Sequence, residues 1–266
     1  LHEAGIPTDV LQYLPGDGAT VGAALTADAR VAGVAFTGST DTARAINRTM
    51  AGRDAAIGVL IAETGGQNAL IADSSSLPEQ LVKDAIGSAF TSAGQRCSAA
   101  RVLFVQDDIA DKVMGMLAGA MAELKVGNPA LLSTDVGPVI DADALQILND
   151  HAKRMDTEAR LIAAAPIDAT STANGSFFAP RAYELASLDQ LQREVFGPIL
   201  HLIRFKGSEL QGVIDQINAT GYGLTLGLHS RVDSTIAQIT NGINVGNVYV
   251  NRNQIGAVVG VQPFGG

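Results

Sequence analysis

The sequence contains a single cysteine in 266 residues, which excludes an internal disulfide. A chain without disulfides is typical of a reducing compartment, so we expect it to work in the cytoplasm. It also has no run of roughly 18 apolar residues, the length that a membrane-spanning helix needs. Residues 1–10 do not have the pattern of a signal peptide. These absences favour a chain that neither crosses a membrane nor depends on covalent cross-links.

Positive charge is also scarce, because 18 Lys and Arg stand against 27 Asp and Glu and give a net charge of -9. This balance argues against nucleic acid or an anionic membrane surface as a partner of this segment. No metal site is expected, because the four histidines lack the spacing of metal ligands; they are His2, His151, His201 and His229. Hydrophobic residues make up 47% of the chain and charged residues 17%, which indicates a globular chain with a sizeable core.

Short β-branched runs alternate with longer helical patterns, which predicts an α/β protein with a largely parallel sheet. Strands are expected at residues 10–14, 31–36, 57–62, 102–105, 161–164, 199–205, 224–229 and 247–251, and a new unit is expected to begin around residues 69–72. Helices are expected from the turn at 37–40 to about residue 50, and over 78–89, 109–124, 142–155, 210–218 and 233–240, with a surface loop at 168–176. Paired glycines at 65–66 predict a domain boundary that divides the chain into 1–66 and 67–266.

Cys97 follows a predicted helix and precedes a predicted strand, within the segment AGQRCSA at residues 93–99. Its small neighbours would let a substrate approach, and Arg96 would favour the thiolate, which is the reactive form. A thiolate can attack a carbonyl carbon. The alternative is a small buried hydrophobic residue, which is the commoner role of a lone cysteine.

Glu63 ends a predicted strand and is followed by Thr64 and the glycine pair at 65–66. Open α/β sheets bind their ligands at the carboxyl ends of strands, and a carboxylate there can activate a water as a general base. Glycines next to it would let a flat ligand lie against the backbone. The alternative is a solvated glutamate before a turn.

Two further turns carry candidate binding residues. Gly38 and Ser39 lie between a predicted strand and a predicted helix, where backbone amides and a hydroxyl could bind a phosphate. An ordinary N-cap serine would give the same local sequence. In the segment REVFGP at 193–198, Glu194 could bond ribose hydroxyls and Phe196 could stack on a ring. An ordinary turn before the strand at 199 is the alternative.

In their order and spacing the four motifs resemble the aldehyde dehydrogenase superfamily, with Glu63 34 residues before Cys97 and Glu194 97 residues after it. Five segments are similar to the glutamate-semialdehyde dehydrogenase module of the bacterial proline utilisation A family. These segments are AETGGQN at 62–68, GQRCSA at 94–99, QREVFGP at 192–198, NATGYGL at 218–224 and VNRNQIGAVVGVQPFGG at 250–266. The similarity covers essentially the whole chain.

The resemblance implies an α/β aldehyde dehydrogenase fold, with part of a Rossmann-like NAD-binding domain in 1–66 and the catalytic domain in 67–266. It implies Cys97 as the nucleophile and Glu63 as the general base. The implied cofactor contacts are Gly38 and Ser39 with the NAD pyrophosphate, Thr64 and Gly65 with the nicotinamide region, and Glu194 and Phe196 with the nicotinamide ribose. The implied substrate contacts are Ser98, Gly256 and Ala257 with the α-carboxylate, and Phe264 with the carbon chain.

The implied activity is the NAD-dependent oxidation of L-glutamate γ-semialdehyde to glutamate, the second step of proline catabolism. It implies a longer bifunctional parent whose FAD-containing proline dehydrogenase domain lies outside this chain, a homo-oligomer that is cytoplasmic or peripheral to the inner membrane. Because the chain has no initiator Met, ends on Gly265-Gly266 and lacks the family's early strands, we expect a fragment with little or no activity alone. An aldehyde dehydrogenase of other specificity and a non-catalytic structural fragment stay open as alternatives.

Overall fold

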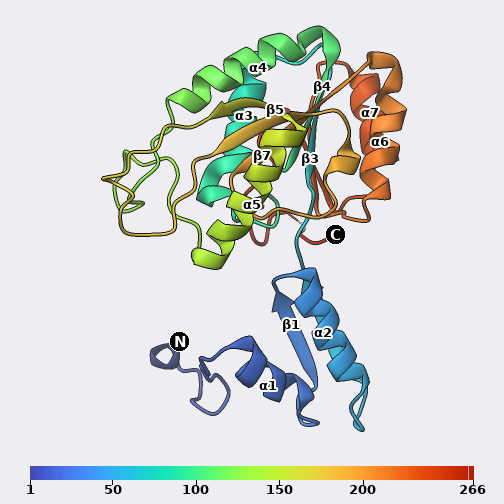
Figure 1. Cartoon of the computed structure of the whole chain (residues 1–266). Coiled ribbons are helices and arrows are strands. Elements are labelled where there is room, and N and C mark those ends of the chain that lie inside the picture. Colours follow the sequence, from blue (N-terminus) through green and yellow to red (C-terminus); the bar gives the residue numbers. More distant parts are fainter. Residues whose placement is uncertain (263) are drawn as a thin grey trace. The chain divides into compact units, whose positions relative to one another are not determined.

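The computed structural model describes residues 1–262 and 264–266, which form two compact units, Leu1–Thr64 and Gly65–Gly266 (Figure 1). The division falls next to the glycine pair at 65–66.

The first unit is built around a two-stranded parallel sheet of β1 (Gly33–Thr37) and β2 (Val59–Glu63), joined by α2 (Thr40–Ala51). Before it come a 3-10 turn (His2–Ala4), a π-helical turn (Gly18–Gly22) and α1 (Ala23–Ala27). The helical segment at residues 18–27 was not predicted from the sequence.

The strand expected at residues 10–14 is wrong. These residues lie in turns and extended chain without a ladder partner, and the Val10 amide donates to the Pro7 carbonyl across a turn. Prolines at positions 7 and 15 bracket the short apolar run, and Tyr13 is almost fully exposed. A β-branched run becomes a strand only where another strand accepts its hydrogen bonds and its side chains have something to pack against.

The second unit contains a seven-stranded sheet with the order β5-β6-β7-β4-β3-β8-β9. All neighbouring pairs are parallel except β5 with β6. The strands are β3 (Ala69–Ala72), β4 (Val102–Gln106), β5 (Arg160–Ala164), β6 (Arg181–Leu185), β7 (Ile199–Phe205), β8 (Thr225–His229) and β9 (Asn247–Val250). The expected α/β fold with a largely parallel sheet is confirmed.

Helices cover this sheet: α3 (Pro78–Phe90), α4 (Asp107–Ala122), α5 (Ala142–Glu158), α6 (Leu210–Ala219) and α7 (Asp233–Gly242). Figure 1 shows α6 and α7 together at one side of the sheet, where Gln238 of α7 donates to Gln211 of α6. Short 3-10 turns lie at Thr91–Gly94, Leu188–Gln190 and Gly207–Glu209. In the part of the chain that the structure describes, no helix is long and apolar enough to cross a membrane.

The central strands β3 and β8 are buried along their whole length, as expected of parallel strands covered on both faces. Their apolar side chains form the core together with β4, β7 and the inner faces of the helices. The sequence RAYEL at 181–185 was not predicted as a strand, because it lacks a β-branched run. It forms β6 because it fits between β5 and β7, which supply partners on both sides.

Parallel pairing brings the amino ends of β3, β4, β7 and β8 to one edge of this sheet. Ala69 pairs with Val102 and with Leu226, and Val102 pairs with His201. The segment that carries Cys97 enters β4 at this edge. In the first unit the carboxyl edge is the relevant one, because Thr37 pairs with Glu63.

Candidate active site

In the first unit the structure brings four of the predicted residues to the carboxyl edge of the small sheet. The Gly38 amide donates to the Glu63 carbonyl over 3.2 Å, which joins the turn after β1 to the end of β2. Thr64 accepts a hydrogen bond of 3.2 Å from the Thr40 hydroxyl. Ser39 is the N-cap of α2, with its Oγ 3.1 Å from the Thr42 amide. The N-cap role of Ser39 is therefore realised, and phosphate binding by Gly38 and Ser39 stays a prediction.

In the second unit the half-buried Cys97 lies just after a left-handed turn. Ser92, Ala93 and Gly94 have φ values of 56°, 54° and 64°. A left-handed conformation costs a non-glycine residue about 1–2 kcal/mol, so surrounding contacts must hold this turn in place. Gly94 is needed because a Cβ there would collide with the carbonyl group of Gly197. We call residues 94–99 the nucleophile loop.

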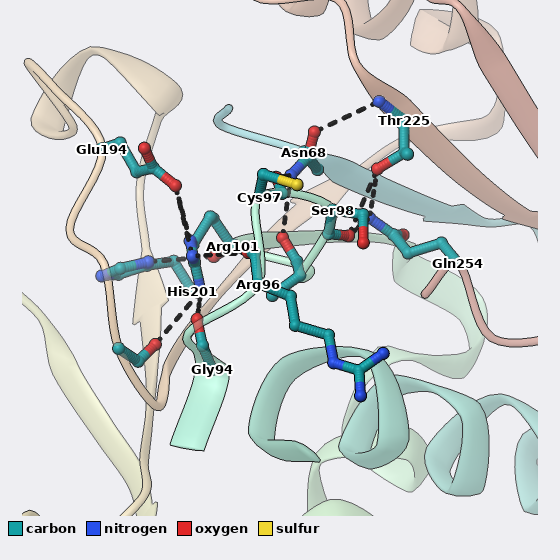
Figure 2. Close-up of polar contacts among 12 residues, drawn as sticks. Asn68, Gly94, Arg96, Cys97, Ser98, Arg101, Glu194, His201, Thr225 and Gln254 are labelled. Carbon is teal, nitrogen blue, oxygen red and sulfur yellow. Dashed lines mark hydrogen bonds and ion pairs between the residues drawn. The ribbon is translucent and has the colours of Figure 1, made fainter. Parts of the chain in front are cut away.

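Three side chains, from Asn68, Thr225 and Gln254, bind consecutive carbonyls of the nucleophile loop, and we call them the carbonyl cradle (Figure 2). The Asn68 amide donates to the Cys97 carbonyl over 2.6 Å and to the Ala99 carbonyl over 3.0 Å. Its oxygen accepts from the backbone amide of Thr225 over 3.2 Å. The start of β8 is therefore connected to the backbone of Cys97 through one buried side chain.

The Ser98 carbonyl lies between those of Cys97 and Ala99 in the sequence. The other two side chains of the cradle, from Thr225 and Gln254, bind it. The Thr225 hydroxyl donates to it over 3.2 Å and the Gln254 amide over 3.4 Å. Gln254 is fully buried, and its own backbone amide donates to the Ser88 hydroxyl of α3. Since Gln254 precedes Gly256 by two residues, the cradle connects the predicted carboxylate-binding segment to Ser98.

Arg101, at the head of β4, binds the other end of the nucleophile loop. Its guanidinium donates to the Gly94 carbonyl over 2.7 Å and to the Arg96 carbonyl over 3.2 Å. It also reaches the Gly197 carbonyl over 3.2 Å and forms an ion pair with Glu194 over 3.2 Å. Arg101 was not predicted from the sequence. The signal was a lone arginine directly before the apolar run at 102–105, because a charge that enters a buried strand has to be paired.

Glu194 lies against the backbone of Gly65 and Gly66, at the start of the second unit. Burial raises the pKa of Glu194, and the ion pair with Arg101 and a hydrogen bond from the Gly66 amide oppose that rise. A side chain at Gly65 would collide with the Glu194 carboxylate in its present position, so the carboxylate would have to move. Phe196 is 42% exposed, and its ring centroid lies 5.0 Å from the Arg101 guanidinium carbon. The two residues predicted to contact the ribose therefore meet at Arg101.

The remaining predicted substrate residues lie in the segment after β9. Gly256 has a φ of 78° and open space on its Cβ side, while Ala257 is partly buried. Phe264 is about half exposed, at 51%. The hydrogen bonds to Ser98 tie the Gln254 end of this segment to the nucleophile, whereas the role of Phe264 rests on the resemblance alone.

The fold is that of an aldehyde dehydrogenase. The model of the aldehyde dehydrogenase family matches residues 1–266, and the chain belongs to this family.

Three relatives make the comparison more specific. Over its whole length the chain is 55% identical to the bifunctional protein PutA of Escherichia coli (strain K12), of which it spans 21%. A structure of a mutant proline utilization A from Bradyrhizobium japonicum is 57% identical with a TM-score of 0.95, over 99% of this chain and 27% of that one. The 1-pyrroline-5-carboxylate dehydrogenase from Thermus, solved with bound NAD, is 33% identical with a TM-score of 0.91, over 99% of this chain and 51% of that one. The chain thus spans about a fifth of the length of the curated PutA relatives that it matches.

Proposed function

We propose that the complete protein containing this chain oxidises L-glutamate γ-semialdehyde to glutamate with NAD, through a covalent intermediate on Cys97. The observation that carries the proposal is the nucleophile loop, whose carbonyls from Gly94 and from Arg96 to Ala99 are bound by buried side chains around a half-buried thiol. The 33% identity to a 1-pyrroline-5-carboxylate dehydrogenase supports the substrate, because 1-pyrroline-5-carboxylate is the cyclised form of the semialdehyde. The 55% identity to a PutA protein supports membership of the same pathway.

The proposed chemistry uses one group from each unit. The Cys97 thiolate forms a bond to the aldehyde carbon and gives a tetrahedral thiohemiacetal. NAD held by the residues named below would supply the oxidant that takes the hydride from this carbon and leaves a thioester on Cys97. Glu63 then takes a proton from a water molecule, which attacks the resulting thioester and releases glutamate and the Cys97 thiolate. The general base role is open to Glu63 because it ends a strand and is only partly buried.

The residues present fit NAD in two places. The amino end of α2, a helix of 12 residues, follows Gly38 and Ser39 directly, and the first-turn amides of such a helix attract a phosphate. Glu194 and Phe196 are fixed against one side chain, Arg101, so a carboxylate and a partly exposed ring are available for a ribose and a base. We further propose Thr64 and Gly65 as contacts of the nicotinamide region.

The substrate's α-carboxylate would be bound by the Ser98 hydroxyl and the backbone amides of Gly256 and Ala257. Neutral donors of this kind can bind a carboxylate without a buried cation. The cradle supports this assignment, because Gln254 connects the segment of Gly256 with the carbonyl of Ser98. Phe264 would pack against the carbon chain of the substrate.

The relatives named as bifunctional support a longer parent, and we propose that it carries an FAD-containing proline dehydrogenase domain and forms a homo-oligomer in the cytoplasm. The expectation that the present chain has little activity of its own stays a prediction. An NADH assay of the chain beside the complete protein tests it.

The decisive experiment compares NADH formation from glutamate semialdehyde and from propionaldehyde in the complete protein. We expect strong preference for the semialdehyde. Ser98→Ala should lower kcat/KM for the semialdehyde about 10-fold or more, through KM, because a hydrogen bond to a charged group is lost. Propionaldehyde turnover should change little, and the exposed Ser208→Ala serves as the matched control.

Two outcomes would contradict the proposal. Preference for an uncharged aldehyde would indicate an aldehyde dehydrogenase of other specificity. Absence of NADH with every aldehyde tested would indicate a protein that retains the fold without the catalysis.

A further inference from the structure

Arg101 joins two loops that the proposed reaction uses separately: the nucleophile loop and residues 194–197, which we call the ribose loop. We infer that Arg101 is a positioning residue that sets Cys97 and the cofactor-binding Glu194 in one fixed arrangement. This inference rests on the proposed function. It adds a coupling between the two halves of the site that the family resemblance did not assign.

The hydrogen-bond inventory of Arg101 supports the inference. A guanidinium has five N–H donors in a rigid fork. All five are used here: Nε and Nη2 on Glu194, Nη2 on the Arg96 carbonyl, and Nη1 on the carbonyls of Gly94 and Gly197. Each acceptor belongs to the nucleophile loop or to the ribose loop, as Figure 2 shows for Glu194 and Gly94.

Burial makes these contacts strong. The Arg101 side chain is 2% exposed and that of Glu194 is 14% exposed. Removing one partner from a buried ion pair leaves the other charge without compensation, which is far more costly than losing a surface pair. The two loops are therefore joined through an ion pair whose disruption would be costly.

The backbone of the nucleophile loop needs such a support. The loop begins at Gly94, the last residue of the left-handed turn that includes Ser92 and Ala93. The shortest bond of Arg101, 2.7 Å, goes to the Gly94 carbonyl. A strained turn persists only where its surroundings fix it, and Arg101 is the side chain that does so at the carboxyl end of this turn.

The backbone carbonyl of Arg101 binds His201, which forms a pair of buried histidines with His151. The ring Nδ1 of His201 lies 3.0 Å from the Arg101 carbonyl, which can only accept, so Nδ1 carries the proton. The other ring nitrogen of His201 then accepts from His151 Nε2, 2.9 Å away. Burial lowers the pKa of His201 to about 3 and that of His151 to about 4, so both are neutral near pH 7. This support adds no positive charge next to the guanidinium.

The coupling is tested in the complete protein with Arg101→Lys, which keeps the charge and loses the fork. Arg160→Lys, at an exposed ion pair on β5, is the matched control. Two measurements need no turnover: the dissociation constant for NAD and the pH profile of Cys97 alkylation by iodoacetamide. We expect Arg101→Lys to weaken NAD binding about 10-fold or more and to change the alkylation rate at pH 7 by a similar factor.

Arg101→Lys should also lower kcat for the semialdehyde, while Arg160→Lys should match the wild-type protein in every measurement. A folded Arg101→Lys protein with wild-type NAD affinity and a wild-type alkylation profile would overturn the inference. So would a change confined to thermal stability.

A second variant keeps the inference testable if Arg101→Lys does not fold. Glu194→Gln leaves Arg101 in place and removes its counter-charge. Because the guanidinium interacts electrostatically with Cys97, alkylation of Cys97 should change several-fold in this variant. An unchanged profile would overturn the coupling, and neither result depends on whether the wild-type protein produces NADH.

Discussion

The two compact units differ most in how much of each is buried. In the second unit the sheet and its helices enclose one continuous core. In the first unit, buried side chains are few among the described residues; they are Thr26, Ala43 and Met50. The apolar side chains of Val59 and Ile61 on β2 are more than half exposed. Cys97, the proposed nucleophile, therefore belongs to the unit with an extensive core, whereas Glu63 and the turn at Gly38 belong to the unit with few buried side chains.

The largest effects should separate the chemical roles of the two units. In the complete protein, Cys97→Ala should abolish NADH formation, a loss on the order of 1000-fold or more, because no covalent intermediate forms. Glu63→Gln should slow steady turnover to a comparable degree but leave a burst of NADH equal to the enzyme concentration. In the proposed mechanism, hydride transfer precedes the step in which Glu63 activates water. Rapid-mixing absorbance at the NADH band distinguishes the two.

The control for this pair is Glu79→Gln, a carboxylate on the outer surface of α3. It should leave both burst and turnover unchanged. Loss of the burst in Glu63→Gln, with the fold intact by circular dichroism, would mean that Glu63 acts before hydride transfer and not as the base for hydrolysis.

The next effect concerns the stability of the units. Leu103 on β4 is fully buried, so Leu103→Ala should lower the free energy of unfolding of the second unit by about 2–5 kcal/mol. The exposed Ile61→Ala on β2 should change stability by about 0.5 kcal/mol or less. Hydrogen exchange of peptides from β4 and β2 in the complete protein measures each unit separately. Equal protection losses in the two variants would show that β2 is as well packed in solution as β4.

Much of the second unit was predictable because its buried strands have nearly continuous apolar sequences. The run at 102–105 and the run at 199–205 are nearly continuous in valine, isoleucine, leucine and phenylalanine, as buried parallel strands require. The helix over 142–155 was expected three residues short of its end. The surface loop at 168–176 is confirmed.

The strand predictions failed where tertiary contacts determine the secondary structure. The apolar residues at 10–14 have no strand to pair with, and RAYEL at 181–185 forms β6 only between two neighbours. Residues 10–14 have the local pattern of a strand but form none, whereas residues 181–185 lack that pattern and form β6. Local sequence alone therefore could not have predicted either outcome.

The site itself was half predictable. The residues that would touch ligands, such as Cys97, Glu194 and Phe196, stand in recognisable motifs. The residues that hold them do not. Asn68 and Gln254 act through hydrogen bonds to backbone carbonyls that lie far away in the sequence, and such partners become visible only when the strands are assembled.

The smallest predicted effect is a pH dependence that belongs to the second unit. The folded pKa of His201 is lowered to about 3, mainly by burial and next by His151, against an ordinary value of 6.5. Below pH 6.5 the unfolded chain binds a proton that the folded chain does not, so stability present above pH 6.5 falls as the pH approaches 3. For one histidine the slope is at most about 1.4 kcal/mol per pH unit.

His201→Asn removes the titration while its amide can still donate to the Arg101 carbonyl. We expect the hydrogen-exchange protection factors of β7 amides, which correct for the intrinsic rate, to fall in the wild-type protein between pH 6.5 and pH 5, and the fall to be smaller in His201→Asn. The exposed His2→Asn, in the first unit, should retain the wild-type profile. Because carboxylates also titrate in this range, only the difference between variant and wild type counts. Identical profiles for His201→Asn and the wild type would mean that the buried histidine pair takes up its protons without unfolding, and that the support behind Arg101 is more tolerant of charge than its burial implies.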